Sequence, residues 1–156
     1  MPILIDNTVL SNFAFVERFE LLYQLFGDPI VITDDVQQEF QAGNALGLFT
    51  DPQSEFNVIE CTAEEKELMV SFQNSLNAGE ASCLAIAIIR GGRILTDDRD
   101  ARKVAAQRQI SISGTLGVLL LAVDREHLTV EEANRLLQKM IEKGYRSPVS
   151  KLEDVS

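Results

Sequence analysis

The chain has 156 residues, a length that suits one domain with a sizeable core, and we predict a single domain over 1–156. Its composition, 46% hydrophobic and 24% charged, is ordinary for a globular protein. The net charge of −10 argues against a protein that coats nucleic acid by bulk electrostatics. No apolar run approaches the roughly 20 residues that span a bilayer. The first residues lack the basic start of a signal peptide, so a cytoplasmic location is expected by default.

In chain order, short apolar runs alternate with segments of helical periodicity. We predict a strand at 3–5, a helix at 11–26, a strand at 29–33, a helix capped by Asp34 or Asp35 that runs to about Phe40, a strand at 56–61, helices at 62–76 and 80–90, a strand at 93–96, a helix at 99–109, a strand at 110–113, helices at 115–126 and about 130–144, and a tail at 145–156.

Local signals mark several helix ends. Thr62 with Glu65, and Thr129 with Glu132, have the spacing of capping boxes. Glycines end or separate helices at Gly43, Gly79, Gly91–Gly92 and Gly144. Short strands that are apolar on both faces and alternate with helices predict an α/β fold, with a central, mainly parallel five-stranded sheet between two helical layers.

Charge and cysteines limit the kind of site. Residues 90–108 carry six basic and three acidic side chains, so this segment is +3 and the remainder −13. A locally basic rim of this kind is compatible with a polyanionic substrate. Cys61 and Cys83 lie in apolar stretches, and His127 is the one histidine. We therefore expect buried free thiols rather than a zinc site or a disulfide.

Acidic residues gather where two predicted strands end. Asp6 directly follows strand 3–5, and Asp97 and Asp98 directly follow strand 93–96, with Asp100 in the turn to the next helix. Because ligands of open parallel sheets bind beyond the carboxyl ends of the strands, these acids should share one edge. Two helical acids join the set: Glu39, beside an apolar helix face, and Glu80, the only acid of helix 80–90.

Each acid has a simpler explanation when it is taken alone. Asp6 could form a turn with Asn7, Glu39 could be a solvated helix position, Glu80 could stabilise the start of its helix, and Asp100 could be an N-cap. Taken together these explanations weaken, because four or more carboxylates at one edge repel one another strongly. Mg²⁺ or Mn²⁺ would remove that repulsion, since hard divalent cations take oxygen ligands and retain waters and substrate phosphates.

Several stretches together resemble the PIN-domain family, the metal-dependent ribonucleases that include the VapC-type toxins. The stretches are "ILIDNTVLSNF" (3–13), "VITDDVQQEF" (31–40), "NAGEASCLAIAI" (77–88), "ILTDDRDARKVA" (94–105) and "GTLGVLLLA" (114–122). The last of these and the helix-rich tail resemble a subgroup of predicted nucleic-acid-binding PIN proteins. Two departures are the doubled Asp97–Asp98 and the glutamate at position 80, where toxins commonly have aspartate.

The resemblance implies roles for individual residues. The catalytic acids would be Asp6, Glu39, Glu80 and Asp98. The metal ligands would be Asp6, Glu80 and Asp98, with Asp97 and Asp100 as auxiliary ligands or holders of water. Thr8 would orient Asp6 or contact the scissile phosphate. Arg90, Arg99 and Arg102 would grip flanking phosphates, although Arg102 could instead pair with Asp98 or a neighbouring acid.

The implied activity is that of a Mg²⁺- or Mn²⁺-dependent endoribonuclease, the toxin of a type II toxin–antitoxin pair. Its partners would be RNA, a cognate antitoxin and a second copy of the chain. The apolar side chains of helix 11–26 could serve that dimer or antitoxin interface, or could simply be core. These side chains are Phe13, Phe15, Phe19, Leu22 and Phe26.

Three other classes fit less well. A receiver-type phosphoacceptor domain needs a lysine at a late strand end, and residues 110–114 contain none. A dinucleotide-binding enzyme needs a glycine-rich turn after the first strand, and residues 5–12 contain no glycine. A PIN-like module that binds nucleic acid or protein without catalysis is the main alternative, and the retained acids argue against it.

Overall fold

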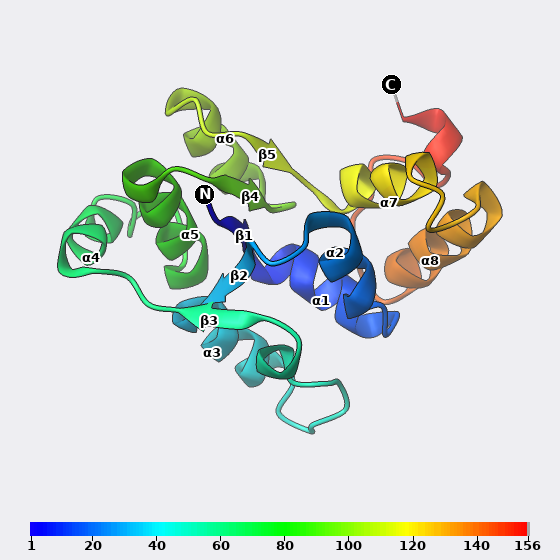
Figure 1. Cartoon of the computed structure of the whole chain (residues 1–156), viewed down its shortest axis with the longest axis horizontal. Coiled ribbons are helices and arrows are strands. Elements are labelled where there is room, and N and C mark those ends of the chain that lie inside the picture. Colours follow the sequence, from blue (N-terminus) through cyan, green and yellow to red (C-terminus); the bar gives the residue numbers. More distant parts are fainter. Residues whose placement is uncertain (156) are drawn as a thin grey trace.

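The computed structural model of the chain describes residues 1–155, in which five strands alternate with eight α-helices (Figure 1). The strands are β1 (Ile3–Ile5), β2 (Ile30–Thr33), β3 (Asn57–Ile59), β4 (Arg93–Leu95) and β5 (Ile112–Ser113). The helices are α1 (Asn7–Phe15), α2 (Phe19–Phe26), α3 (Asp34–Gly43), α4 (Ala63–Val70), α5 (Ala78–Arg90), α6 (Arg99–Gln107), α7 (Thr115–Asp124) and α8 (Val130–Glu142). Two short 3-10 helices are η1 (Pro52–Ser54) and η2 (Leu152–Asp154).

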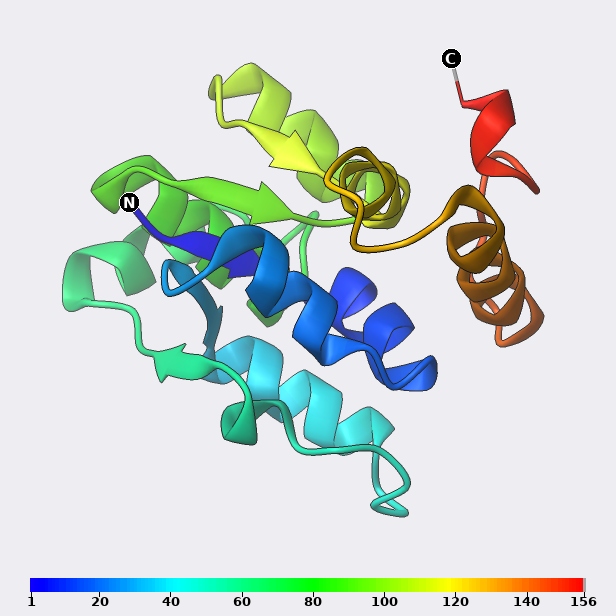
Figure 2. The ribbon, with the colours of Figure 1, turned by 45° about the vertical axis from the view of Figure 1, so that its right-hand side comes forward.

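The sheet has the strand order β3-β2-β1-β4-β5, and all four pairings are parallel. The predicted α/β fold with a five-stranded parallel sheet is therefore confirmed. The chain passes from edge strand β3 through α4 and α5 to β4, on the far side of β1 (Figure 2). This crossover makes β1 and β4 neighbours, and the register pairs Ile5 directly with Leu95, although the two residues are 90 positions apart in the chain.

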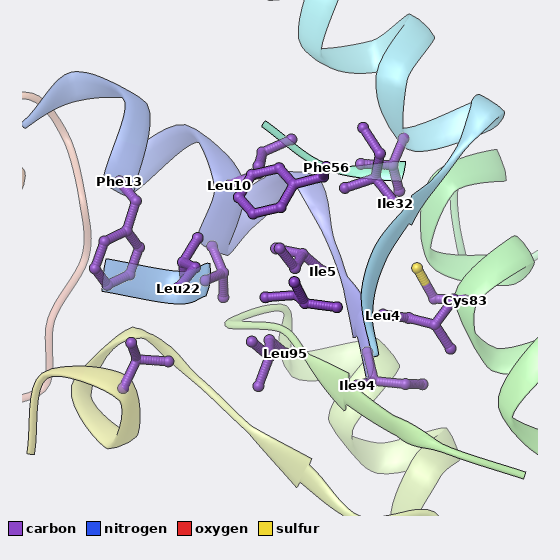
Figure 3. Packing of buried hydrophobic residues seen from close by; sticks show 14 of the residues in the cluster. Leu4, Ile5, Leu10, Phe13, Leu22, Ile32, Phe56, Cys83, Ile94 and Leu95 are labelled. Atoms are coloured by element: carbon purple, nitrogen blue, oxygen red, sulfur yellow. The ribbon is translucent and has the colours of Figure 1, made fainter. Parts of the chain in front are cut away.

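Apolar side chains fill the space on both faces of the sheet. Leu4 and Ile94 point toward α5, where they meet Cys83 (Figure 3). Ile5 and Leu95 point to the opposite face, toward α1 and α2 (Figure 3). The strands are buried on both faces because helices cover each of them, which explains why the strands read as continuous apolar runs.

The prediction of one continuous helix over 11–26 was wrong. The structure divides this stretch into α1 and α2 at Glu17, whose φ of +56° lies in the left-handed region. The Arg18 N–H donates to the Phe13 carbonyl at 3.0 Å and closes the turn. The apolar periodicity continues across the break because both helices bury a face in the same core. Periodicity alone therefore did not reveal the turn.

Two predicted helix boundaries also needed correction. The N-cap of α3 is Thr33, whose Oγ1 accepts from the Val36 N–H at 3.0 Å, rather than Asp34 or Asp35. Gly79 does not separate two helices but lies in the first turn of α5. The preceding helix ends earlier, at Val70, and α5 has its own cap, Asn77.

The apolar side chains of the first two helices mainly serve the core. Phe13, Phe19 and Leu22 are buried, and Phe15 packs edge-on against Phe49 with 4.9 Å between ring centroids. Phe26 is half-buried. Most of the apolar side chains that suggested an interface are therefore packed inside the molecule.

The two cysteines are free and buried, as predicted. Among residues 1–155, no helix combines the length and hydropathy that a membrane span needs.

Candidate active site at the carboxyl edge of the sheet

The carboxyl ends of β1 and β4 lie side by side and carry the first acids of the site. The Asp6 N–H donates to the Leu95 carbonyl at 2.9 Å, so Asp6 continues the ladder one residue beyond β1. Thr96 continues β4 in the same way through a 2.8 Å bond to the Ser113 carbonyl. Parallel pairing therefore places the groups that follow the two strands against each other.

Asp6 is the most buried acid of this edge, with 1% of its surface exposed. Its Oδ2 accepts hydrogen bonds from Thr8 Oγ1 at 2.8 Å and from Thr96 Oγ1 at 2.9 Å. Its Oδ1 is buried and has no hydrogen-bond partner among the residues that the structure describes. Burial raises the pKa of Asp6, although the two threonine hydroxyls act in the opposite direction. A buried carboxylate oxygen without a partner needs a proton or a cation.

Glu80 reaches the same edge from the start of α5. It forms a capping box with Asn77, in which Glu80 Oε1 accepts from the Asn77 N–H at 3.0 Å and Asn77 Oδ1 accepts from the Glu80 N–H at 2.9 Å. Only 6% of its surface is exposed. Burial first, and then the neighbouring Asp98 carboxyl and the Asp6 charge, raise the pKa of Glu80 to about 8. Glu80 therefore stabilises the start of its helix and also faces the other acids.

Asp98 is the N-cap of α6. Its Oδ2 accepts from the Ala101 N–H at 2.8 Å, and its own N–H donates to Thr96 Oγ1 at 3.1 Å. The alternative that Asp100 caps this helix was therefore wrong. Asp100 lies in the first turn with its side chain exposed.

Glu39 is half-buried rather than a solvated helix position. Its Oε1 accepts from the Gly79 N–H at 2.6 Å, so the middle of α3 is joined to the start of α5. Burial raises the pKa of Glu39, with a further contribution from the charges of Asp6 and Asp35. The side chains of the predicted quartet thus come from four different elements and influence one another electrostatically.

Gly79 is needed for this position of Glu39. A Cβ on Gly79 would lie 2.7 Å from Glu39 Oε1 and 2.9 Å from its Cδ, closer than real contacts allow. We expect Gly79→Ala to displace the Glu39 carboxylate and to reduce the RNA cleavage that the sequence resemblance predicts by about tenfold to a hundredfold. The fold should persist, because alanine favours a helix over glycine by about 1 kcal/mol.

Gly43→Ala is the matched control, since it adds the same methyl group to a helical glycine with nothing within 4 Å of the new Cβ. Cleavage rates and thermal melts of the two variants, measured side by side, check the expectation. Equal rates for Gly79→Ala and the wild type would contradict it.

Asp97 is directed away from the quartet. Its Oδ1 accepts from the Thr115 N–H at 2.8 Å, and its Oδ2 accepts from Thr115 Oγ1 at 2.5 Å and from Asn12 Nδ2 at 3.3 Å. Gly114, the N-cap of α7, has no side chain with which to cap. Asp97 supplies that cap from the turn after β4, and both of its carboxylate oxygens accept hydrogen bonds there.

Thr8 connects the two groups of acids. Its hydroxyl donates to Asp6 and accepts from the Asp97 N–H at 2.9 Å. The resemblance implies two roles for Thr8, and this geometry favours the orientation of Asp6 over contact with the scissile phosphate.

The three arginines of the prediction have different surroundings. Arg99 lines a cleft of about 640 Å³ that also contains Thr8 and Asp98. Arg102 lines a neighbouring cleft of about 470 Å³, and in residues 1–155 it forms no ion pair with Asp98 or another acid.

Arg90 does not reach this edge, so the prediction that it grips a phosphate near the acids was wrong. It ends α5, and the next residue, Gly91, packs against Met1 at the amino end of the sheet. Its guanidinium is bound to Glu65 at 2.7 Å and to the Glu60 carbonyl at 2.8 Å. The sequence did not reveal this pairing because Glu65 already had a sufficient role in the capping box of α4.

The carboxylates do not form a closed metal cage. Within residues 1–155, no three His, Cys, Asp or Glu side chains are grouped closely enough to enclose an ion. The donor set nevertheless fits a cation that needs few protein ligands, because Mg²⁺ is usually bound by one or two carboxylates together with waters and substrate phosphates. The buried Asp6 Oδ1 without a partner and the raised pKa of Glu80 are what such a cation would compensate.

Sequence reasoning missed several polar groups of this region. Asn12 is buried on α1 and joins Asp97 to Thr115, and its position on an otherwise apolar helix face was an available signal. The segment after α8 supplies Lys143, Tyr145 and Arg146 to the clefts beside the acids, and no local pattern indicated that contact.

Comparison with known proteins agrees with this architecture. A search of curated proteins finds no match. Among solved structures, the fold is similar to that of PAE2754 from Pyrobaculum aerophilum, with a TM-score of 0.55 and 19% sequence identity over 79% of this chain and 90% of that one. A family model described as a PIN domain matches residues 2–155, nearly the whole chain. The chain therefore belongs to the PIN-domain family, whose members are generally nucleases.

Proposed function

We propose that the chain is a metal-dependent endoribonuclease that uses Asp6, Glu39, Glu80 and Asp98 at the carboxyl edge of the sheet. The observation that carries the proposal is the convergence of these acids from β1, α3, α5 and the start of α6, with the pKa values of three of them raised by burial. Carboxylates that are held close together, with no basic side chain to balance their charge, favour the binding of a cation.

Asp6, Glu80 and Asp98 would hold Mg²⁺ or Mn²⁺, with Asp100 as an auxiliary ligand. A bound ion of this kind supplies an activated water and polarises a phosphoryl oxygen. The residues of the chain have supporting tasks. Thr8 and Thr96 fix one oxygen of Asp6 through hydrogen bonds and leave the other free. Glu39, whose pKa is raised by burial and which accepts from the Gly79 N–H, would accept a proton near the start of α5.

We further propose that this nuclease is the toxin of a type II pair, with a cognate antitoxin and a homodimeric state as in VapC-like proteins. This part rests on the resemblance of the motifs rather than on a contact in the structure. Growth arrest on expression of the chain, relieved by the product of an adjacent gene, would support it. Continued growth at high expression would contradict it.

Asp98→Asn in an RNA cleavage assay tests the nuclease itself. Asparagine caps a helix as well as aspartate does, so α6 should keep its start while the ligand charge is lost. We expect the wild type to cut labelled RNA with Mg²⁺ or Mn²⁺ and to stop when EDTA is added, and we expect the folded variant to be inactive. RNA binding without cleavage in either protein would instead favour the noncatalytic binding module.

A further inference from the structure

Two threonine hydroxyls direct their protons to the same oxygen of Asp6. Thr8 and Thr96 donate to Asp6 Oδ2 at 2.8 and 2.9 Å, and the two hydroxyl oxygens lie farther from each other, at 3.4 Å. Thr8 Oγ1 accepts from the Asp97 N–H at 2.9 Å, and Thr96 Oγ1 accepts from the Asp98 N–H at 3.1 Å. Because a hydroxyl has a single proton, an N–H that donates to its oxygen turns that proton toward another acceptor, here Asp6. These two peptide groups therefore select the oxygen of Asp6 that is bonded and leave Oδ1 without a partner among the described residues.

The side chain of Asp97 holds the turn that presents these N–H groups. It accepts from the N–H and the hydroxyl of Thr115, the first residue of α7, and from the amide of Asn12 on α1. The amide of Asn12 also donates to Thr115 Oγ1 at 3.0 Å. Thr115 and Asn12 are both buried, so the partners of Asp97 are fixed inside the molecule. The turn after β4 is thus attached to α1 and α7 through one carboxylate.

Gly114 provides the space in which this carboxylate lies. A Cβ on Gly114 would overlap Asp97 Oδ1 and would lie 3.2 Å from the Thr96 carbonyl oxygen. The φ of −126° at Gly114 is open to any residue. The missing side chain is therefore needed for space rather than for an unusual backbone conformation.

We propose that Asp97 is a positioning residue for the metal site and not a metal ligand. Its side chain holds the turn, the turn presents an N–H to Thr8, and Thr8 fixes Asp6 with Oδ1 open to the cation. The inference rests on the proposed nuclease function. The negative charge of Asp97 is assigned to the N-terminus of α7, where it is favourable. Groups that orient a ligand change metal affinity by about tenfold to a hundredfold when they are altered, although they do not contact the ion.

Two substitutions separate positioning from ligation, because one removes the charge of Asp97 and the other removes its place. Asp97→Asn keeps an oxygen for the Thr115 N–H, and the Asn12 amide can turn its own oxygen toward the new NH₂ group. Gly114→Ala keeps the carboxylate but displaces it from the start of α7. We expect Asp97→Asn to bind Mn²⁺ within about threefold of the wild type, since asparagine and aspartate cap helices equally well. We expect Gly114→Ala to bind Mn²⁺ about tenfold or more weakly.

Electron paramagnetic resonance of free Mn²⁺, titrated with protein in the absence of RNA, measures this affinity without any cleavage. Gly43→Ala is the control for the added methyl group, which meets nothing within 4 Å there. Asn134→Ala is the control for stability, since it removes hydrogen bonds to Leu152 and Glu153 that lie outside the network of Asp97. Both controls should bind Mn²⁺ like the wild type. Thr115→Val, which loses the hydroxyl and keeps the N–H, should weaken Mn²⁺ binding and provides a second test if Gly114→Ala does not fold.

The positioning role is overturned if Gly114→Ala or, where that variant is unfolded, Thr115→Val keeps wild-type affinity for Mn²⁺. It is also overturned if Asp97→Asn loses as much affinity as Gly114→Ala, which is the result that a ligand would give. The failure of the nuclease gives a different result. If the wild type binds Mn²⁺ with the expected order of variants but cuts no RNA, the nuclease is wrong and the positioning role stands. If the wild type cuts RNA and Gly114→Ala keeps both its Mn²⁺ affinity and its kcat, the positioning role is wrong and the nuclease stands.

Discussion

Asp6→Asn is expected to abolish RNA cleavage, with a loss of at least about 10³-fold, and to leave the protein folded. Asparagine retains an oxygen that can accept from Thr8 and Thr96, so the hydrogen bonds that position residue 6 persist. The change replaces the buried Oδ1, which has no partner among the described residues, with an uncharged NH₂ group. The negative charge that attracts a cation is then lost at the most buried position of the site.

Single-turnover cleavage rates, with circular dichroism to verify folding, measure the effect of Asp6→Asn. Asp124→Asn is the control, because it removes the same charge from the last residue of α7, about 14 Å along the helix from Thr115. A folded Asp6→Asn protein that cut RNA within tenfold of the wild-type rate would sink the assignment of Asp6.

Glu80→Gln is expected to stop cleavage and, in the absence of metal, to stabilise the protein at pH 8. The pKa of Glu80 is raised to about 8 in the folded chain, chiefly by burial, above its ordinary value of 4.5. A raised carboxyl pKa gives stability that is fully present below pH 4.5 and is lost as the pH rises toward 8. Glutamine removes this loss and still fits the capping box with Asn77. The gain in the free energy of unfolding should be about 1–2 kcal/mol, with allowance for solvent screening.

Thermal melts in EDTA from pH 5 to pH 9 test this expectation. Glu132→Gln is the matched control, since Glu132 has the same place in the capping box of α8 but its pKa is lowered by the hydrogen bonds with Thr129. That variant should gain nothing at pH 8. Added Mg²⁺ should stabilise the wild type at pH 8 and have much less effect on Glu80→Gln. The expected loss of stability is contradicted if the melting temperature of the wild type, compared with that of Glu80→Gln, does not fall between pH 5 and pH 8.

The sequence predicted the sheet and the meeting of Asp6 with Asp98 because both depend on a general rule. Parallel strands end at one edge, and the apolar runs that mark the strands are short and clear. Glu39 and Glu80 were found through their places beside apolar helix faces. What brings them together is the bond between Glu39 and the Gly79 N–H, a contact across 40 positions that no local pattern contains.

The errors of the sequence prediction have two physical origins. The pairing of Arg90 with Glu65 joins residues 25 positions apart, so no local pattern contains it. The turn at Glu17 and the cap of α5 at Asn77 are local, and the capping-box spacing of Asn77 with Glu80 was an available signal that was overlooked. Gly79 was predicted to end a helix because glycine commonly does so, whereas here its missing Cβ makes room for a carboxylate. Lys143, Tyr145 and Arg146 escaped notice because the residues that line the same clefts lie in α1, in the turn after β4 and in α6 rather than nearby in the chain.

The acids also share a relation to the helices that begin around them. Asp6 immediately precedes α1, Asp98 caps α6, Asp97 bonds the first N–H of α7, and Glu39 bonds an N–H in the first turn of α5. The aligned peptide dipoles of a helix place about half a positive charge at its N-terminus. Four such termini therefore offset part of the carboxylate charge before any cation arrives. The consequence is that the fold would not depend on a bound metal in the way that a zinc finger does, and the same positive ends would remain available to a phosphate that entered with the proposed ion.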